Sequence, residues 1–300
     1  MAHRHGVVGT APHRDPLRRL VAALAISVVI LVVELVGGIL TNSLALLADA
    51  GHVFGDVAGI GLAALATWAA RRAPNTKRTY GLLRAEILAA ALNAVILFGL
   101  AGLILLEAVR RLADPPPLAD GLMLVVALVG LIGNLLSLAL LHPHRRDSLN
   151  VRGAYLEVLG DLAGSVAVIV AAGFIIVARV AAADAIASII IAVLILPRAW
   201  SVLREAVDIL LEATPRRVDL DEVQGHIRGI PGIADVHDLH AWTVTSGLDV
   251  LSAHVVLEPG ADSSTILDEL CRCLSDDFDI EHSTFQLESP DRRRLEGVSV

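Results

Sequence analysis

The sequence predicts a six-helix transmembrane domain followed by a small α+β domain. Hydrophobic residues make up 55% of the 300 residues, more than the roughly 45–50% that is usual in soluble domains. They are gathered in long runs with few charges, and a membrane helix needs about 20 such residues. After residue 205 the chain becomes more polar, and many of the acidic residues behind the net charge of −8 lie there.

Six apolar runs are expected to cross the membrane. They cover residues 18–40, 44–70, 83–108, 118–141, 152–178 and 183–203. The first run is expected to be a retained helix, because it is long enough to span and no cleavage site follows it. We therefore predict four parts: an N-terminal segment at 1–17, the transmembrane domain at 18–205, a soluble domain at 206–290 and a tail at 291–300.

Basic residues indicate the orientation of these helices. They are frequent in the N-terminal segment, in the second and fourth loops, and near the end of the sixth run, where Arg198 and Arg204 lie. The first, third and fifth loops have fewer basic residues, although Arg110 and Arg111, after the third run, weaken this difference. The positive-inside rule then predicts that both termini lie in the cytoplasm, and an even number of spans agrees. We expect a multi-pass protein of the plasma (inner) membrane.

The soluble segment is expected to contain the order α-β-β-α-β. The stretches "DLDEVQGHIRGI" and "DSSTILDELCRCL" have helical apolar spacing, whereas "ADVHDLHAWTVT", "LDVLSAHVVLE" and "DIEHSTFQLES" resemble strands. This order predicts a ferredoxin-like domain with helices on one face of a sheet. Cys271 and Cys273 form neither a zinc-ribbon pair nor a disulfide framework, so we expect reduced, ordinary thiols.

Two apolar runs carry pairs of ionisable residues at matching spacing. His52 and Asp56 are four residues apart in the second run, and Glu157 and Asp161 are four residues apart in the fifth. Side chains at this spacing share one helix face, and such groups are costly in a membrane when unpaired. Two helices that meet along these faces would bring four N and O donors together, which suits a tetrahedral divalent cation.

The segments "NSLALLADAGHVFGDVAGIGLA" and "NVRGAYLEVLGDLAGSVAVI" closely resemble the second and fifth helices of the cation diffusion facilitators, a family of zinc-type divalent-cation transporters. The stretch "KRTYGLLRAEILAAALNA" resembles the start of their third helix, and "VHDLHAWTVTSGLDVLSAHVV" and "HSTFQLESP" resemble their cytoplasmic domain. The resemblance implies a homodimer in the lipid bilayer, with a metallochaperone-like cytoplasmic domain. It implies export of divalent metal driven by proton entry.

The sequence departs from the zinc pattern at one position. Zinc-exporting members typically have H-x-x-x-D on both helices, whereas Glu157 stands in place of the second histidine. A carboxylate is a harder ligand than imidazole and favours cations such as Mn²⁺, although zinc also accepts carboxylates. We expect Zn²⁺ first, with Mn²⁺, Co²⁺, Fe²⁺ or Cd²⁺ as alternatives. Repulsion among the carboxylates favours bound protons in an empty site, which metal binding then releases.

Other polar residues in the spans have two interpretations. Asp49 and Asn134 could lie along the cation path, as could Glu34 and Asn93. Alternatively, they hydrogen-bond between neighbouring helices, as polar groups in membrane proteins commonly do.

Histidines on the predicted strands suggest a second metal site, which would sense cytoplasmic metal and tighten the dimer. By resemblance to the family, His237, His254 and His282 are the first choice, with Glu288 or His240 as alternates. His237 and His240 differ in parity, so they would face opposite sides of an ideal strand.

Two other functions compete with transport. An intramembrane metalloenzyme needs a general base beside an open ligand position, and no HExxH motif is present. A membrane metal sensor would carry the same ligands without transport. We predict a transporter rather than an enzyme, with protons as counter-ion, no cofactor beyond divalent metal and no nucleic-acid partner.

Overall fold

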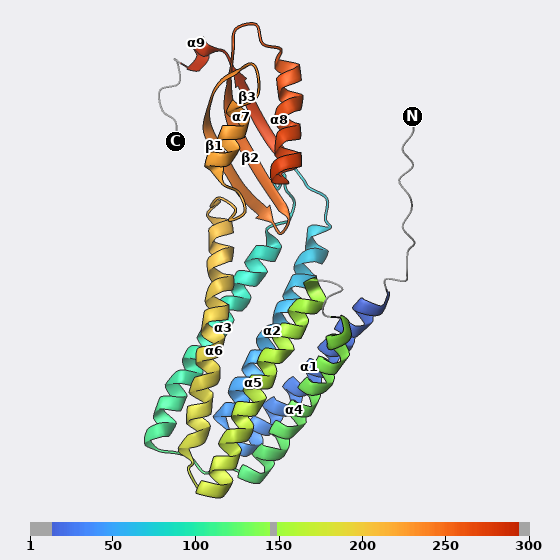
Figure 1. The fold of residues 1–300 in the computed structure, drawn as a ribbon. Helices are drawn as coiled ribbons and strands as arrows, with labels where there is room; N and C mark the ends of the chain where they lie inside the picture. Colours follow the sequence, from blue (N-terminus) through green and yellow to red (C-terminus); the bar gives the residue numbers. More distant parts are fainter. Residues whose placement is uncertain (1–13, 145–148, 294–300) are drawn as a thin grey trace. The chain divides into compact units, whose positions relative to one another are not determined.

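The computed structural model in Figure 1 describes residues 14–144 and 149–293. The predicted N-terminal segment at 1–17 and tail at 291–300 therefore fall mostly outside the described residues. The chain divides into two compact units. We call residues 1–61 with 92–201 the membrane unit, and residues 62–91 with 202–300 the sheet unit.

Six helices are long and apolar enough to cross a membrane, which confirms the six predicted runs. They are α1 (Arg14–Thr41), α2 (Leu44–Ala70), α3 (Ala85–Ala113), α4 (Asp120–Leu141), α5 (Leu149–Ala178) and α6 (Ala182–Leu210), with a short 3₁₀ turn, η1 (His142–His144), after α4. Helices α3 and α6 continue past the predicted ends at 108 and 203. The predicted domain boundary at 205 falls inside α6.

Small residues let the helices of the membrane unit pack closely. Helix α4 packs against both α1 and α5. On α2, Gly51 and Gly55 lie directly against Leu100 and Leu97 of α3, and a Cβ atom at either glycine would require the facing leucine to shift. This contact fits the general use of small residues where membrane helices meet.

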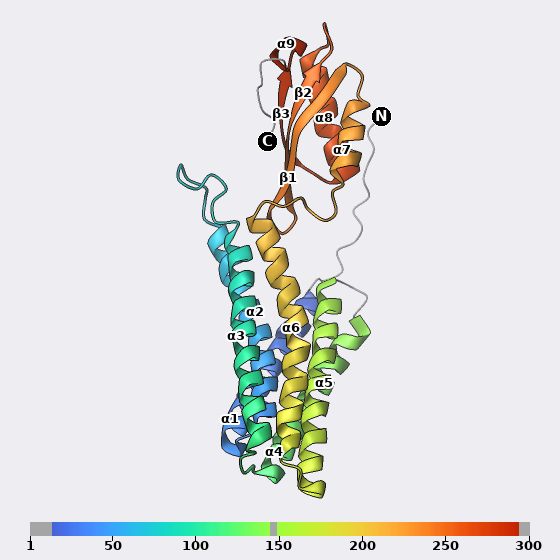
Figure 2. The ribbon, with the colours of Figure 1, turned by 90° about the vertical axis from the view of Figure 1, so that its left-hand side faces the viewer.

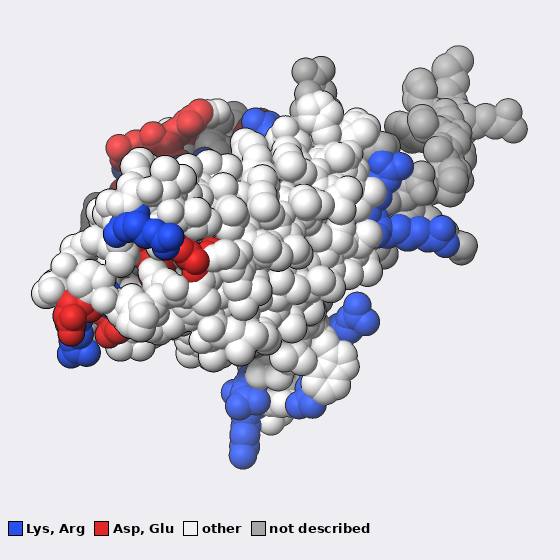
Figure 3. Space-filling view, turned by 90° about the horizontal axis from the view of Figure 1, so that it is seen from below, with Lys and Arg blue, Asp and Glu red and all other residues white. Residues whose placement is uncertain are grey.

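The surface of the membrane unit is largely apolar. Many large aliphatic side chains on α1 to α6 are exposed, which is costly in water and favourable in lipid. Figure 3 looks onto the end where α1 joins α2, and most of that surface is white, with a few charged side chains. Some charged side chains of the membrane unit are paired with each other, namely Glu107 with Arg111 and Asp120 with Arg179.

Helix α2 is held at its beginning by a residue of α6. The buried Asp184 carboxylate accepts hydrogen bonds from Ser43 Oγ at 2.6 Å, from the Leu44 backbone N–H at 2.8 Å and from the Ala45 N–H at 3.2 Å. The first N–H groups of a helix have no partner within it, so Asp184 caps α2 from another helix. The cap fixes the start of the helix that carries His52 and Asp56.

The sheet unit has the predicted order α-β-β-α-β, with one further helical turn at its end. Its elements are α7 (Leu220–Arg228), β1 (Ile233–Thr245), β2 (Leu248–Leu257), α8 (Ser263–Phe278), β3 (His282–Glu288) and α9 (Pro290–Arg293). Strand β2 is central, antiparallel to β1 and parallel to β3. Figure 2 shows α7 and α8 on the same side of this sheet.

Alternation along the strands gives the sheet two different faces. On β2, Leu251, Ala253 and Val255 are buried in the apolar core that also contains residues of α7 and α8. His254 lies between two of these residues and so points to the opposite face. This second face carries the ionisable residues described below.

Candidate metal centres

The membrane unit brings together a histidine and two aspartates from α2 and α5. His52 Nε2 lies 3.3 Å from Asp161 Oδ1 and 3.9 Å from Asp56 Oδ2. One ligand atom from each of the three residues lies within 4.8 Å of the others. Tetrahedral zinc with bonds of about 2.1 Å separates its ligands by about 3.4 Å. The two distances from His52 Nε2 are therefore close to the spacing that such an ion needs.

Donor atoms in this cluster lack the hydrogen bonds that buried polar atoms normally make. Within residues 14–144 and 149–293, His52 Nδ1, Asp56 Oδ2 and Asp161 Oδ1 are buried without a hydrogen-bond partner. Buried carboxylates without such compensation are costly. The free oxygens are thus suited to a bound cation.

Glu157 is near this cluster but is held by a different partner. Its Oε1 atom accepts a hydrogen bond from Arg198 Nη2 at 2.5 Å. The same guanidinium nitrogen lies 3.4 Å from Asp56 Oδ1. Glu157 is not among the three residues whose donors converge within the described chain. The structure therefore brings together three of the four predicted ligands and places the fourth in an ion pair.

Arg198 lies beside the candidate metal ligands, a position that the sequence analysis did not expect. We expected it with the basic residues at the cytoplasmic end of the sixth run, but it lies well inside α6, which continues to Leu210. It is half-exposed and contacts carboxylates from both α2 and α5. The available signal was an arginine within one apolar run, in a chain whose second and fifth runs carry carboxylates.

The other polar residues of the spans form interhelical contacts. Asn134 of α4 donates to Ser165 Oγ of α5 at 3.2 Å, and Ser165 Oγ donates to Asp49 Oδ2 of α2 at 3.5 Å. Asn93 of α3 donates to the Gly55 carbonyl of α2 at 3.0 Å. Glu34 of α1 is buried close to the Asp49 side chain.

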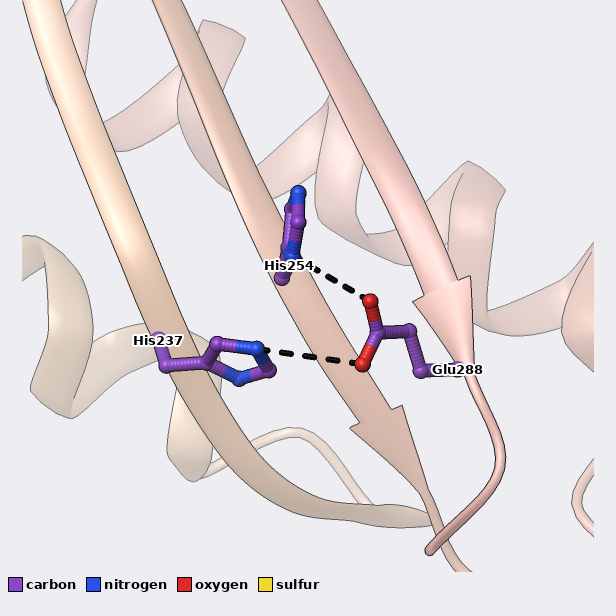
Figure 4. Close-up of side chains that lie close together, drawn as sticks. All are labelled: His237, His254 and Glu288. Carbon is purple, nitrogen blue, oxygen red and sulfur yellow. Dashed lines mark ion pairs between the residues drawn. The ribbon is translucent and has the colours of Figure 1, made fainter. Parts of the chain in front are cut away.

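The sheet unit contains a second cluster, shown in Figure 4. His237 of β1 and His254 of β2 are paired across the strands, with their ring centroids 5.2 Å apart. Glu288, at the end of β3, lies 3.2 Å from His254 Nδ1 and 3.7 Å from His237 Nε2. Glu288 is 3% exposed and His237 is 8% exposed. These three residues have donor atoms within 4.8 Å of one another.

His282 does not join this cluster, contrary to our first choice from the sequence. It is paired with Val250, whereas the partner of His254 on β3 is Gln286. Four residues of strand separate these positions, about 13 Å at a rise of about 3.3 Å per residue. The exposed His282 ring instead packs edge-on against Tyr80, with centroids 6.2 Å apart. Glu288, an alternate in the sequence analysis, takes its place beside the two histidines.

A β-bulge changes the face on which His240 lies. His237 pairs with His254 and His240 with Ser252, so the two residues between the histidines on β1 oppose only Ala253 on β2. Both histidines therefore share one face of the sheet. The parity argument that separated them is therefore wrong. Asp238, in the bulge with φ +51°, contacts His240 Nε2 at 3.2 Å and His254 Nε2 at 3.7 Å. His240 thus lies beside the cluster, linked to it through Asp238.

Comparison with known proteins identifies the family. Residues 20–211 match the model of the cation efflux transmembrane domain, and residues 215–290 match that of the cation efflux protein cytoplasmic domain. These matches, with six membrane-length helices, define an integral membrane transporter rather than an enzyme. The chain belongs to the cation efflux family, the cation diffusion facilitators recognised from its motifs.

Individual relatives share most of their length with this chain. The metal cation efflux system protein CzcD of Cupriavidus metallidurans is 45% identical over 90% of this chain and 86% of its own. The zinc transporter ZitB of Escherichia coli is 41% identical over 100% of this chain and 98% of its own. A cadmium, cobalt and zinc/H(+)-K(+) antiporter of Bacillus subtilis is 39% identical over 86% of this chain and 85% of its own. A solved structure, the metal-bound C-terminal domain of the Cupriavidus CzcD transporter, is 44% identical over 24% of this chain and 99% of that chain, with a TM-score of 0.23.

Proposed function

We propose that this protein exports divalent metal cations, Zn²⁺ first among them, from the cytoplasm in exchange for protons. The observation that carries the proposal is the convergence of His52, Asp56 and Asp161 inside the membrane unit. Their carboxylate oxygens without hydrogen bonds, and His52 distances of 3.3 and 3.9 Å, suit a four-coordinate cation with one position left for water or a fourth ligand.

The charge of this site favours a divalent ion. Asp56, Glu157 and Asp161 with Arg198 carry a formal charge of −2 when all four are ionised and His52 is neutral. One divalent cation neutralises that charge, whereas a monovalent ion leaves a net charge in a low-dielectric surrounding. Arg198 supplies the positive charge that offsets the additional carboxylate of Glu157.

The donor set supports zinc as the first substrate. Imidazole with two carboxylates is a donor set that zinc accepts readily. Glu157, the residue that could shift the preference to Mn²⁺ or another harder ion, is held by Arg198. The names of the relatives include zinc, cadmium and cobalt. Zinc is therefore the leading substrate, and release of Glu157 from Arg198 would admit the alternatives.

Proton exchange follows from the chemistry of the same donors. A metal ion requires deprotonated carboxylates and a neutral imidazole, so it competes with protons for His52, Asp56 and Asp161. Entry of metal expels protons, and protonation from the other side of the membrane releases the metal. A proton gradient can then drive metal export.

The sheet unit supports a regulatory metal site in a cytoplasmic dimer. His237, His254 and Glu288 offer two imidazoles and a carboxylate on the sheet face opposite α7 and α8. The matching family domain is named as cytoplasmic, which agrees with both termini on the cytoplasmic side of an inner membrane. Metal at this site would report the cytoplasmic concentration and tighten a homodimer.

Flux in sealed proteoliposomes tests the transport proposal. A pH gradient is imposed, and Zn²⁺, Mn²⁺, Co²⁺ and Cd²⁺ are followed with wild type and with Asp161→Ala. We expect zinc movement that dissipates the gradient and is lost in the variant. Binding of metal without flux of any of the four ions would replace the transporter by a membrane sensor.

A further inference from the structure

Two carboxyl groups lie deep in the membrane unit, apart from the candidate metal ligands. Glu34 of α1 and Asp49 of α2 are each 1% exposed. The neighbouring polar side chains, Asn134 of α4 and Ser165 of α5, are also buried. Four helices thus surround a small polar centre that the metal site does not use.

The helices leave space for these two carboxyl groups. On α4, Gly130 faces Glu34 Oε1, and on α5, Gly164 faces Asp49 Oδ1. A Cβ atom at either glycine would collide with the facing carboxylate oxygen. Glycine at these two positions thus leaves the carboxyl groups room in the interior.

The hydrogen bonds around the pair are one donor short. Asp49 Oδ2 accepts a hydrogen bond from the Ser165 hydroxyl, and the Ser165 oxygen in turn accepts one from the Asn134 amide. In the described part of the chain, Glu34 Oε2 and Asp49 Oδ1 are buried without a hydrogen-bond partner. The two carboxyl groups are nevertheless within hydrogen-bonding reach of each other. A proton on one of them supplies the missing donor.

The charges around the pair also favour a proton. Asp161 of α5 acts electrostatically on both Glu34 and Asp49 and adds a further negative charge. Among the described residues, no Lys or Arg side chain is an electrostatic partner that offsets the pair. Two ionised carboxylates in contact, buried and facing a third, would be very unfavourable. A single shared proton removes one of these charges.

We propose that Glu34 and Asp49 form a proton-binding site, separate from the metal ligands, that carries one counter-transported proton. This inference rests on the proposed metal–proton exchange. A proton suits the site better than a second metal ion, because the centre is fully buried and, among the described residues, no third His, Cys, Asp or Glu ligand atom converges on the pair.

The pair is placed to respond to metal. Asp49 precedes His52 by one turn of α2, and Ser165 follows Asp161 by one turn of α5. With one shared proton the pair carries a charge of −1, and without it −2. A divalent cation held by His52 and Asp161 stabilises the more negative form, so the O–H bond breaks and the proton leaves to water while its electron pair stays on the carboxylate. By reciprocity, a proton on the pair weakens metal binding to the same extent.

Counting protons tests this assignment on the purified full-length protein in detergent. A pH dye in weak buffer reports the protons released per Zn²⁺ bound for wild type, Glu34→Gln and Asp49→Asn. Ser137→Ala is the matched control, because it removes another buried polar group of α4 that lies outside the pair. We expect about one proton fewer per zinc ion in the two variants and no change in the control. The slope of log Kd against pH should fall by about one in the same variants.

The outcomes separate this inference from the proposed function. If wild type releases no protons on binding zinc, metal–proton exchange itself fails. If wild type releases protons and both variants release the same number with zinc binding intact, the site at Glu34 and Asp49 is overturned.

Infrared spectroscopy covers the case in which neither variant folds. A carbonyl band of a protonated carboxyl group is then sought in wild type at neutral pH and in Ser165→Ala, which loses the hydroxyl donor to Asp49. A band that shifts in Ser165→Ala supports the pair. A band that is absent or does not move overturns it.

Discussion

Arg198 Nη2 donates to Glu157 Oε1 across a distance of 2.5 Å, joining α6 to α5 inside the membrane unit. The same nitrogen reaches Asp56 of α2. The carboxylate that replaces a histidine in the metal-site pattern is therefore accompanied by a guanidinium that offsets its charge. The positive charge of Arg198 offsets part of the negative charge that a bound metal ion would otherwise neutralise.

Removal of Arg198 should tighten zinc binding and slow transport. Arg198→Ala takes away a positive charge beside Asp56 and leaves Glu157 available as a fourth ligand. We expect the Kd for Zn²⁺ to fall about tenfold, or about 1.4 kcal/mol, with a lower turnover because release becomes harder. Calorimetric titration and initial flux rates measure the two effects.

Arg204→Ala is the matched control for this experiment. Arg204 is also on α6, but its side chain is largely exposed, and it forms a long ion pair with Asp208 at 4.0 Å. Its removal should leave both Kd and turnover unchanged. An unchanged or weaker zinc affinity in Arg198→Ala would contradict the counter-charge role.

Replacement of Glu157 by histidine should change the metal preference of transport. The flux should be higher when Arg198 is replaced at the same time. Glu157→His adds a softer donor and should raise the ratio of Zn²⁺ to Mn²⁺ flux. The single variant leaves the Arg198 guanidinium without its closest carboxylate, so transport should decrease. Glu157→His with Arg198→Ser should recover flux and keep the higher ratio. A ratio equal to wild type in both variants would remove Glu157 as a determinant of selectivity.

The cytoplasmic candidate site gives a direct comparison of Glu288 and His282. In an Asp161→Asn background, which disables the membrane site, remaining zinc binding reports the sheet unit. Glu288→Gln should weaken that binding by at least tenfold, because Glu288 contacts both His237 and His254. His282→Gln should leave it unchanged, because His282 packs against Tyr80. The reverse result in calorimetry would restore the site first expected from the sequence.

The two cysteines of α8 should differ in reactivity. Burial, and then the nearby Asp277 carboxylate, raises the pKa of the Cys273 thiol, whereas Cys271 is exposed. The thiolate is the reactive form, so iodoacetamide at pH 7.5 should modify Cys271 several-fold faster. Raising the pH increases the thiolate fraction of Cys273 and should narrow the difference. Mass spectrometry of timed samples measures both rates, and equal rates at pH 7.5 would be the contrary finding.

The fold could be predicted because its signals are local. Each apolar run is long enough to identify a spanning helix without knowledge of its neighbours. The alternation around Leu251, Ala253 and Val255 identifies the buried face of β2 in the same way. His52, Asp56 and Asp161 followed from helical spacing on two such runs.

The remaining features depend on contacts between distant segments. Arg198 joins the site because α6 continues past its most apolar part and packs beside α2 and α5. Glu288 rather than His282 meets the histidines because of the register of β3 on β2, which is set by tertiary packing. The bulge at Asp238, which turns His240 to the face of His237, has no simple repeat in the sequence.

The cap that Asp184 places on α2 has a mechanical consequence. Three hydrogen bonds tie the first residues of α2 to α6, the helix that carries Arg198. Any tilt of α2 against α6 therefore pivots about this end. His52 lies eight residues from Leu44 along the helix, a lever arm of about 12 Å at about 1.5 Å per residue. A tilt of a few degrees then moves the imidazole by less than an ångström, enough to alter metal coordination while the pivot stays bonded.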